Sequence, residues 1–208
     1  MPKKKRDAEA TKSKILQEAM QLFSQKGFDV TTVDDIAKAC DINKAMVYYY
    51  YQSKAGLYEE LMSVLMQNIY DDIFKAYQRS ANATEGLNAF VLTYGEYAIK
   101  HPYFPALLLR ELSNSGANLP DKMFSKMRNI FTLLSEILDR GEKEGVFHDV
   151  KPMMIHFMII GTINLMVTTT PLRQVAQKYE NVNTCAQCSI EDISKYVFEK
   201  IKQMLEAR

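Results

Sequence analysis

The segment from residue 31 to residue 57 constrains the fold more than any other part of the chain, because it contains helix-start signals in close succession. Thr32 is followed three residues later by Asp35. This pair approximates a capping box and predicts a helix beginning at Val33. Asn43 is a second N-cap residue and predicts a second helix. Between them, Asp41 tolerates the left-handed conformation that a tight turn requires. The segment therefore predicts two short helices joined by a tight turn, followed by a third helix after a cap at Ser53.

Two short helices joined by a tight turn form the layout with which proteins set one helix into the major groove of DNA. The second helix is expected from Lys44 to about Tyr50, with Val47 on its apolar side and the opposite side exposed. The residues expected to contact DNA lie on that exposed side or at the starts of helices, with Lys12 at the N-terminus of the first helix of the chain. They are Lys12, Thr32, Asn43, Lys44, Ala45, Met46, Tyr48, Tyr49 and Lys54.

A dense, gap-free set of residues in the first quarter of the chain carries a resemblance to a known family. The set comprises Thr11, Ile15, Leu16, Ala19, Leu22, Phe23, Lys26, Gly27, Phe28, Thr31, Ile36, Ala37, Lys38, Ala39, Ile42, Asn43, Lys44, Ala45, Val47, Tyr48, Tyr50, Tyr51, Ser53, Lys54 and Leu57. This pattern resembles the DNA-binding domain of the TetR family of bacterial transcription regulators. It departs from the usual pattern at Asp41, Tyr49 and Ala55, where glycine, histidine and glutamate are common.

The resemblance implies two domains. Residues 1–53 would form a helix-turn-helix DNA-binding domain with a basic N-terminal arm, and residues 54–208 a helical regulatory domain that binds a ligand and dimerises. The composition agrees with an all-α fold, because the chain has only 8 Gly and 6 Pro and shows no recurrent alternation of the β type. No apolar run is long enough for a membrane span and no signal peptide is evident, so a cytoplasmic protein with reduced thiols is expected.

The positive charge is concentrated near the helix-turn-helix segment. Residues 1–54 hold 10 Lys and Arg against 7 Asp and Glu, whereas the rest of the chain is slightly acidic. The densest cluster is Lys3-Lys4-Lys5-Arg6. It is interpreted either as a flexible arm that gains affinity by releasing counterions from DNA phosphates or as a plain disordered terminus, with a nuclear-import signal as a third possibility.

The last two long helices are expected at Pro152–Thr170 and Ile190–Glu206. In the family that the chain resembles, the corresponding helices form a four-helix bundle with those of a second subunit. The dimer interface is therefore expected to include Ile193, Val197, Phe198 and Ile201. The alternative is that these apolar residues belong to the internal core of a single chain.

Methionine and aromatic side chains are abundant on the helices that would surround a ligand cavity, and a deformable apolar pocket is a plausible use for them. The candidate ligand-binding residues are Phe90, Tyr94, Tyr97, Phe104, Met127, Phe131, Phe157, Met158 and Asn164. For any single one of these residues, ordinary core packing is the alternative. As a group they favour a small apolar or aromatic ligand.

Cys185-Ala186-Gln187-Cys188 is a C-x-x-C motif in a polar segment before the last helix. Such a pair can form inert loop thiols, a redox-active disulfide or half of a metal site, although no further ligand pair lies nearby in sequence. No catalytic motif is evident, and neither a cofactor nor a metal is expected.

The sequence thus predicts a ligand-responsive repressor that binds a pseudo-palindromic operator as a homodimer. The alternatives are a redox-sensing regulator that uses Cys185 and Cys188, a helical carrier or enzyme with a vestigial helix-turn-helix, and a nucleoid-type protein without sequence preference.

Overall fold

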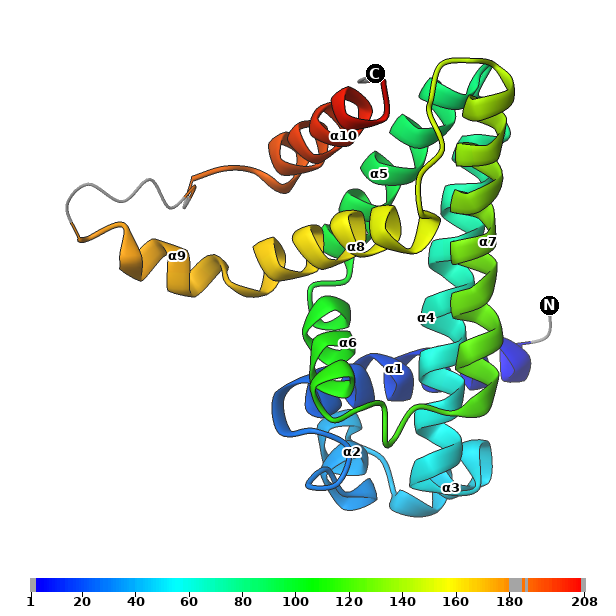
Figure 1. Ribbon diagram of the computed structural model, residues 1–208. Helices are drawn as coiled ribbons and strands as arrows, with labels where there is room; N and C mark the ends of the chain where they lie inside the picture. The colour runs from blue at the N-terminus through cyan, green and yellow to red at the C-terminus, as the bar shows by residue number, and fades with distance from the viewer. Residues whose placement is uncertain (1–2, 180–184, 186, 207–208) are drawn as a thin grey trace. The chain divides into compact units, whose positions relative to one another are not determined.

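The computed structural model describes residues 3–179, 185 and 187–206, and every regular element in these ranges is a helix (Figure 1). The all-α fold expected from the sequence is confirmed. The described helices are α1 (Lys3–Lys26), α2 (Val33–Cys40), α3 (Lys44–Tyr51), α4 (Lys54–Tyr77), α5 (Ala83–Lys100), α6 (Tyr103–Ser113), α7 (Asp121–Lys143), α8 (Pro152–Thr168), α9 (Thr170–Ala176) and α10 (Ile190–Glu206).

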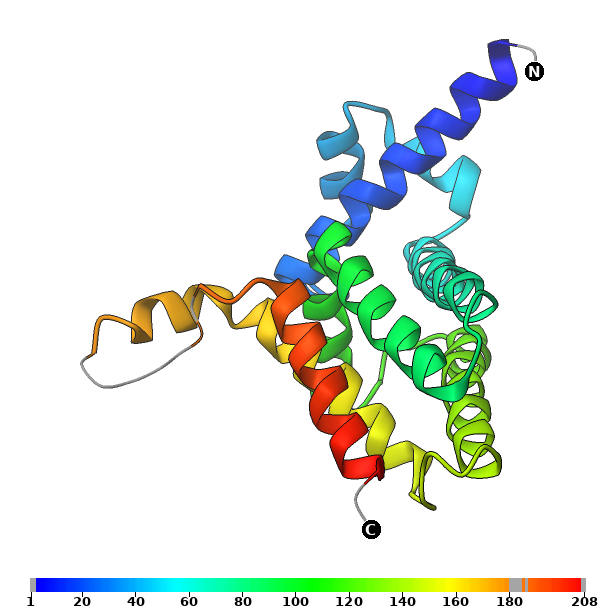
Figure 2. The same cartoon turned by 90° about the horizontal axis from the view of Figure 1, so that it is seen from above.

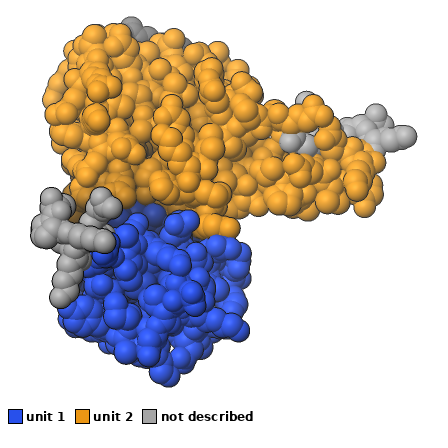
Figure 3. All heavy atoms as spheres, turned by 180° about the vertical axis from the view of Figure 1, so that it is seen from behind, with its two compact units in different colours: residues 1–66, 106–125 blue, residues 67–105, 126–208 orange. Residues whose placement is uncertain are grey.

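The chain divides into two compact units, which are coloured blue and orange in Figure 3. Unit 1 contains residues 1–66 and 106–125, and unit 2 contains residues 67–105 and 126–208. Most of α6 therefore belongs with the N-terminal helices, although residues 67–105, which belong to unit 2, separate the two parts of unit 1 in sequence. The boundary expected between residues 53 and 54 falls inside unit 1. The division into a DNA-binding domain of residues 1–53 and a regulatory domain of residues 54–208 stays a prediction.

The core of unit 1 is built where the apolar faces of its helices meet. Ile15, Phe23, Ile36 and Leu57 are each fully buried, at the helical spacing that the sequence shows. The Phe23 ring packs edge-on against Tyr58, with the ring centroids 4.9 Å apart. Burial of aromatic and aliphatic side chains of this size is the main stabilising contribution to such a small unit.

In unit 2, α10 packs along α5 and also against α8, as Figure 2 shows. A Cβ atom added to Gly95 on α5 would lie 2.0 Å from Oγ of Ser194 on α10. The absence of a side chain at residue 95 is therefore what allows the two helices to approach so closely. A buried hydrogen bond links α5 to α8, in which the Tyr94 hydroxyl donates to Oδ1 of Asn164 at 2.8 Å.

A short helix that the sequence analysis did not predict follows α8. The sequence predicted a helix ending at Thr170-Pro171 and a polar loop beyond it, but α9 begins at Thr170 and is bent by 64° from α8. Pro171 lies in the first turn of α9, where its missing N–H costs no hydrogen bond. The proline that was interpreted as a helix end thus also begins the next helix.

No single helix of the described residues has the length and apolar character needed to cross a membrane. Only α8 and α9 taken together meet that test of length and composition, and they do so as a bent pair.

Candidate nucleic-acid interface

The predicted capping signals are present around α2. The Thr32 side chain accepts a hydrogen bond from the Asp35 backbone N–H at 3.1 Å, and the Asp35 carboxylate accepts one from the Thr32 N–H at 3.1 Å. The second of these bonds is the main reason that the pKa of Asp35 lies below its ordinary value. At the other end of α2, Asp41 adopts φ 54° and ψ 47° in the left-handed region, as the turn requires.

Helix α3 begins as predicted, because the Asn43 side chain accepts a hydrogen bond from the Ala45 N–H at 2.9 Å. Val47 and Tyr51 are the buried residues of this helix, and they fix its inner side against the rest of unit 1. The outer side carries exposed residues of mixed chemistry. They are Lys44, Ala45, Met46, Tyr48 and Tyr49, of which Tyr49 is 77% exposed.

The exposed side of α3 therefore combines one cation with two aromatic hydroxyl groups. Lys44 forms an ion pair with Asp34 of α2, with 3.2 Å between Nζ and Oδ1, and both side chains remain largely exposed. The Tyr49 and Tyr50 rings pack edge-on with centroids 5.1 Å apart. Tyrosine hydroxyls and lysine ammonium groups are suited to phosphate and base-edge contacts, so the chemistry of this surface is compatible with DNA.

Lys54 is held in place by unit 1 itself. Its Nζ donates to the backbone carbonyls of Phe28 and Asp29 at 2.9 and 3.2 Å and lies 4.4 Å from the centroid of the Phe28 ring. The ammonium group thus ties the start of α4 to the connection between α1 and α2. Its expected contact with phosphate stays a prediction and would have to share these donors.

The structure changes the argument for Lys12. The sequence analysis expected this residue at the N-terminus of the first helix, whereas α1 begins at Lys3, so Lys12 lies well inside it. The helix dipole is thus no reason for a phosphate contact there. The side chain is exposed, with Nζ 5.7 Å from the centroid of the Tyr50 ring. The backbone of the basic cluster Lys3–Arg6 is likewise helical.

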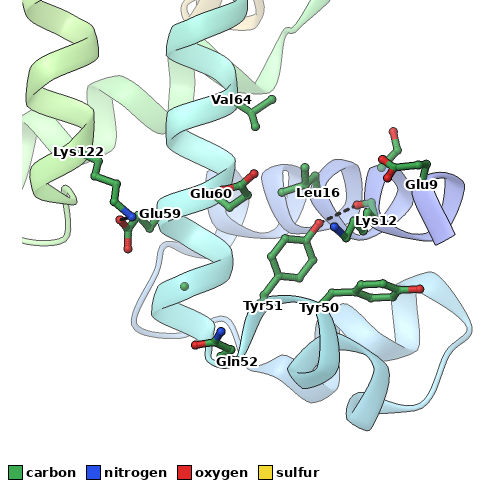
Figure 4. Close-up of a pocket in the computed structure, with 12 residues that line it drawn as sticks. Glu9, Lys12, Leu16, Tyr50, Tyr51, Gln52, Glu59, Glu60, Val64 and Lys122 are labelled. Atoms are coloured by element: carbon green, nitrogen blue, oxygen red, sulfur yellow. Dashed lines mark hydrogen bonds and ion pairs between the residues drawn. The ribbon is translucent and has the colours of Figure 1, made fainter. Parts of the chain in front are cut away.

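A cleft of about 590 Å³ lies beside α3, between α1 and α4 (Figure 4). The Tyr51 hydroxyl donates to the Lys12 carbonyl oxygen at 3.1 Å, and the Lys122 ammonium group pairs with Glu59 at 2.7 Å. The lining combines three glutamates with two lysines, so it has no excess of positive charge for phosphate. It comprises Glu9, Lys12, Ser13, Leu16, Tyr50, Tyr51, Gln52, Gly56, Glu59, Glu60, Val64 and Lys122.

The residues expected to bind a ligand divide by exposure. Phe90, Tyr94, Tyr97, Phe104 and Asn164 are each at most 2% exposed. Met127 and Phe131 are half-buried. Phe157 and Met158, however, are 58% and 42% exposed on the outer side of α8, which corrects the expectation that they line an interior cavity. The ligand site as a whole stays a prediction.

A similar correction applies to the expected dimer interface. Ile193, Val197, Phe198 and Ile201 are only 3–8% exposed and face the helices on which α10 packs within its own chain. They match the alternative of internal core that the sequence analysis left open. Periodicity identified the apolar side of α10 correctly but could not tell whether that side meets its own chain or a partner.

The sequence analysis missed the role of α6 in unit 1. Nη2 of Arg110 donates to the Gln25 carbonyl at the end of α1, at 3.0 Å. Glu111, which is 1% exposed, accepts a hydrogen bond from Tyr58. Two adjacent charged residues in an apolar helix were the available signal, because a buried glutamate requires a specific partner.

With this geometry described, the chain can be compared with known proteins. A family model described as "Bacterial regulatory proteins, tetR family" matches residues 15–61, and one described as "Tetracyclin repressor-like, C-terminal domain" matches residues 84–180. The chain belongs to the TetR family. The first TetR-family match contains α2 and α3 in full, and the second contains α6 to α9 in full and all of α5 except its first residue.

Two TetR-family relatives and one solved structure illustrate the similarity. The chain is 30% identical over 141 residues to the probable HTH-type transcriptional regulator YttP of Bacillus subtilis, covering 65% of this chain and 66% of YttP. It is 30% identical over 125 residues to the negative transcriptional regulator IcaR of the biofilm operon icaADBC in Staphylococcus aureus, covering 60% and 66%. The matches thus span just under two thirds of these relatives. The transcriptional regulator FadR of Bacillus subtilis, in complex with stearoyl-CoA, has the same fold, with a TM-score of 0.71, 21% identity and coverage of 90% and 95%.

Proposed function

We propose that this protein is a ligand-responsive transcriptional repressor that acts in the cytoplasm and binds a pseudo-palindromic operator as a homodimer. The observation that carries the proposal is the outer side of α3, which presents Lys44, Tyr48 and Tyr49 to solvent while Val47 and Tyr51 anchor the helix. A capped, anchored helix with an exposed polar and aromatic side is the form in which a helix-turn-helix protein reads the major groove.

The relatives favour repression and an apolar ligand. IcaR is a negative regulator by name, and the FadR neighbour was crystallised with stearoyl-CoA, an acyl chain on a polar carrier. In the proposed mechanism the ligand binds more tightly to a conformation in which the two α3 helices no longer match successive major grooves. By linkage, operator DNA then weakens the affinity for the ligand by the same factor.

For the dimer we propose the outer side of α8 rather than the buried side of α10. The exposed apolar residues of α8 lie at helical spacing, and they are Met153, Met154, Phe157, Met158 and Leu165. Gly161 lies among them, and a Cβ atom added to it would meet nothing within 4 Å. Leu172 and Val175 of α9, which has no buried residue, extend the exposed apolar surface. An apolar surface of this kind is typical of an interaction site.

Selection of DNA fragments from a random pool, followed by measurement of affinity, tests the DNA-binding part of the proposal. The wild-type protein is expected to enrich a pseudo-palindrome whose half-sites lie about 34–36 Å apart, one helical turn, or slightly more. Tyr49→Ala should relax preference at particular base pairs at a cost of about 1–3 kcal/mol, whereas Lys44→Ala should weaken binding to all sequences and reduce the salt slope by about one.

Tyr196→Ala supplies the matched control, because Tyr196 is 65% exposed on α10 in unit 2 and should leave both properties unchanged. Equal affinity for all DNA sequences would contradict the proposal and indicate a nucleoid-type protein. Absence of DNA binding would contradict it and indicate a helical carrier or enzyme. Release from the selected DNA by stearoyl-CoA or a shorter acyl-CoA, and not by oxidant, would favour the ligand-responsive form over the redox-sensing alternative.

A further inference from the structure

The two cysteines of the C-x-x-C motif form a disulfide in unit 2, which corrects the expectation of reduced thiols for this pair. The Cα atoms of Cys185 and Cys188 are 5.1 Å apart, within the range that a disulfide spans. The Cys188 backbone N–H donates to the Cys185 carbonyl oxygen at 3.1 Å, so a backbone turn brings the two residues together. Both residues are half-buried, so the pair remains partly accessible to small molecules in solution.

The side of this turn that faces α8 and α9 is anchored by Arg173. The Arg173 guanidinium group donates to the Cys185 carbonyl oxygen, to the Met166 carbonyl near the end of α8, and to the Thr170 hydroxyl at 3.0 Å. A planar guanidinium group with several donors can hold three such acceptors in a fixed geometry. The position of Cys185 is therefore tied to the junction between α8 and α9.

The other side of the turn leads directly into α10. Ser189 follows Cys188, and its hydroxyl accepts from the Asp192 backbone N–H at 3.0 Å and donates to the Asp192 carboxylate at 2.7 Å. This cap begins the helix whose first turns contact α5 at Gly95. The disulfide turn is therefore joined to the cap of α10 with no residue between them.

The backbone of Cys185 lies in the left-handed region, with φ 52°. That conformation is unfavourable for a residue other than glycine, because its Cβ atom crowds the backbone. The ring that the disulfide closes holds Cys185 there, and reduction would remove this restraint. The reduced turn is then free to relax to a right-handed conformation that no longer fits the contacts of Arg173 and Ser189.

The third cysteine provides a contrast within the same chain. Cys40 is 1% exposed in α2, and burial raises the pKa of its thiol. Because the thiolate is the reactive form, a buried thiol with a raised pKa reacts slowly. Reagents in solution should therefore distinguish Cys40 from the pair formed by Cys185 and Cys188.

We propose that Cys185 and Cys188 are a reversible thiol–disulfide exchange site for low-molecular-weight disulfides, and that the closed form stabilises the start of α10. In oxidation, one cysteine thiolate attacks a sulfur of the small disulfide, forms a mixed disulfide and expels one small thiolate. The second cysteine thiolate then attacks the protein sulfur of that mixed disulfide, closes the bond between the two residues and expels the other small thiolate. The two protons lost by the cysteines pass through water to the two thiolates released, and a small thiol reverses both steps.

The experiment equilibrates the whole wild-type protein in buffers of glutathione and glutathione disulfide, followed by alkylation and peptide mass spectrometry. The expected result is one reversible two-electron transition confined to Cys185 and Cys188, while Cys40 remains a thiol throughout. Persistent thiols in excess glutathione disulfide, or a mixed disulfide with glutathione as the end product, would overturn the exchange site.

Hydrogen exchange tests whether the disulfide stabilises the start of α10. Backbone amides of residues 190–197 should exchange at least severalfold faster in the reduced protein than in the oxidised protein, whereas those of α2 should not change. The variant Cys185→Ser/Cys188→Ser should exchange at the faster rate in both buffers. Equal rates for α10 in the two wild-type states would show that the disulfide does not stabilise the helix start. Neither measurement uses DNA, so a result that contradicts the exchange site is distinct from one that contradicts the proposed repressor function.

Discussion

The Tyr58 hydroxyl donates a 2.7 Å hydrogen bond to Oε1 of Glu111, and the two side chains are each 1% exposed. Oε2 of the same carboxyl group is buried and has no hydrogen-bond partner among the described residues. The bond joins α4 to α6 inside unit 1, where the Tyr58 ring also contacts Phe23 and Phe28. Burial, followed by the bond to Glu111, raises the pKa of Tyr58 far above its ordinary value, so Tyr58 remains a donor.

Tyr58→Phe is expected to destabilise the protein, because it keeps the ring and removes the only hydrogen bond that the Glu111 side chain forms among the described residues. The loss should be about 1–3 kcal/mol in the free energy of unfolding measured with urea. Tyr196→Phe, at an exposed position, should change that free energy by less than about 0.5 kcal/mol. A Tyr58→Phe protein as stable as the wild type would mean that this bond contributes nothing net to unit 1.

The ion pair between Lys44 and Asp34 leads to a prediction about DNA affinity. Asp34→Asn removes a carboxylate beside the exposed side of α3 and frees the Lys44 ammonium group for phosphate. Affinity for all DNA sequences should rise by about 2- to 5-fold, since an exposed pair of this kind is worth at most about 1 kcal/mol. Asp139→Asn, an equal change in net charge on unit 2, should not have this effect. Equal affinities for both variants in a titration at fixed salt would argue against a DNA contact by Lys44.

The capped helices of unit 1 were predictable because their signals are local. Thr32, Asn43 and Ser53 each bond a backbone N–H within three residues, so the sequence alone contains both partners. The same holds for the left-handed conformation of Asp41, which depends on one residue type in one turn. Local chemistry of this kind placed the starts of α2, α3 and α4 correctly.

The grouping of α6 with the N-terminal helices was not predictable in the same way. It rests on Tyr58 meeting Glu111 and on Arg110 meeting the Gln25 carbonyl, which are contacts between residues far apart in sequence. For α8 and α10, periodicity gave the apolar sides but not their partners. Phe198 is buried within its own chain, whereas Phe157 is exposed, and hydrophobicity cannot distinguish the two.

This difference between Phe157 and Phe198 gives the test of the dimer surface. Phe157→Glu should produce monomers in sedimentation and weaken operator binding, because it places a charge in the proposed interface without disturbing the core. Phe198→Glu should instead unfold unit 2, since it buries a charge in the core. Ile99→Glu is the matched control, because Ile99 is 50% exposed on α5 and lies outside the proposed surface. A Phe157→Glu dimer with unchanged affinity would place the interface elsewhere.

His156 makes the stability of unit 2 depend on pH. Its ring contacts Phe131 and Phe157, its Nδ1 is buried without a hydrogen-bond partner among the described residues, and burial lowers its pKa. Below the ordinary pKa of 6.5, the unfolded chain binds a proton at this residue that the folded chain does not bind. The contribution of His156 to the free energy of unfolding is therefore fully present above pH 6.5. It is lost as the pH falls from 6.5 toward the lower pKa that His156 has in the folded protein.

The measurement for His156 is the difference in unfolding free energy between the wild type and His156→Leu as a function of pH. His101, whose pKa burial also lowers, contributes to both proteins and cancels in this difference. The wild type should lose stability relative to the variant as the pH is lowered below 6.5. A difference that is constant with pH would show that His156 binds its proton equally well in the folded and unfolded chains.

The close approach of α10 to α5 gives the last prediction. In Gly95→Ala the new Cβ atom would lie 2.0 Å from Oγ and 3.1 Å from Cβ of Ser194, so either the Ser194 hydroxyl must rotate away or the two helices must shift apart. The expected cost is about 1–3 kcal/mol in urea unfolding, as for other overpacked cores. Ser194→Ala removes the nearer of the two atoms, and its hydroxyl has no hydrogen-bond partner among the described residues, so this change alone should cost little. The double variant should recover a large part of the stability that Gly95→Ala loses, giving a coupling energy of at least about 0.5 kcal/mol. Strictly additive effects would mean that residues 95 and 194 do not meet in solution as they do in this fold.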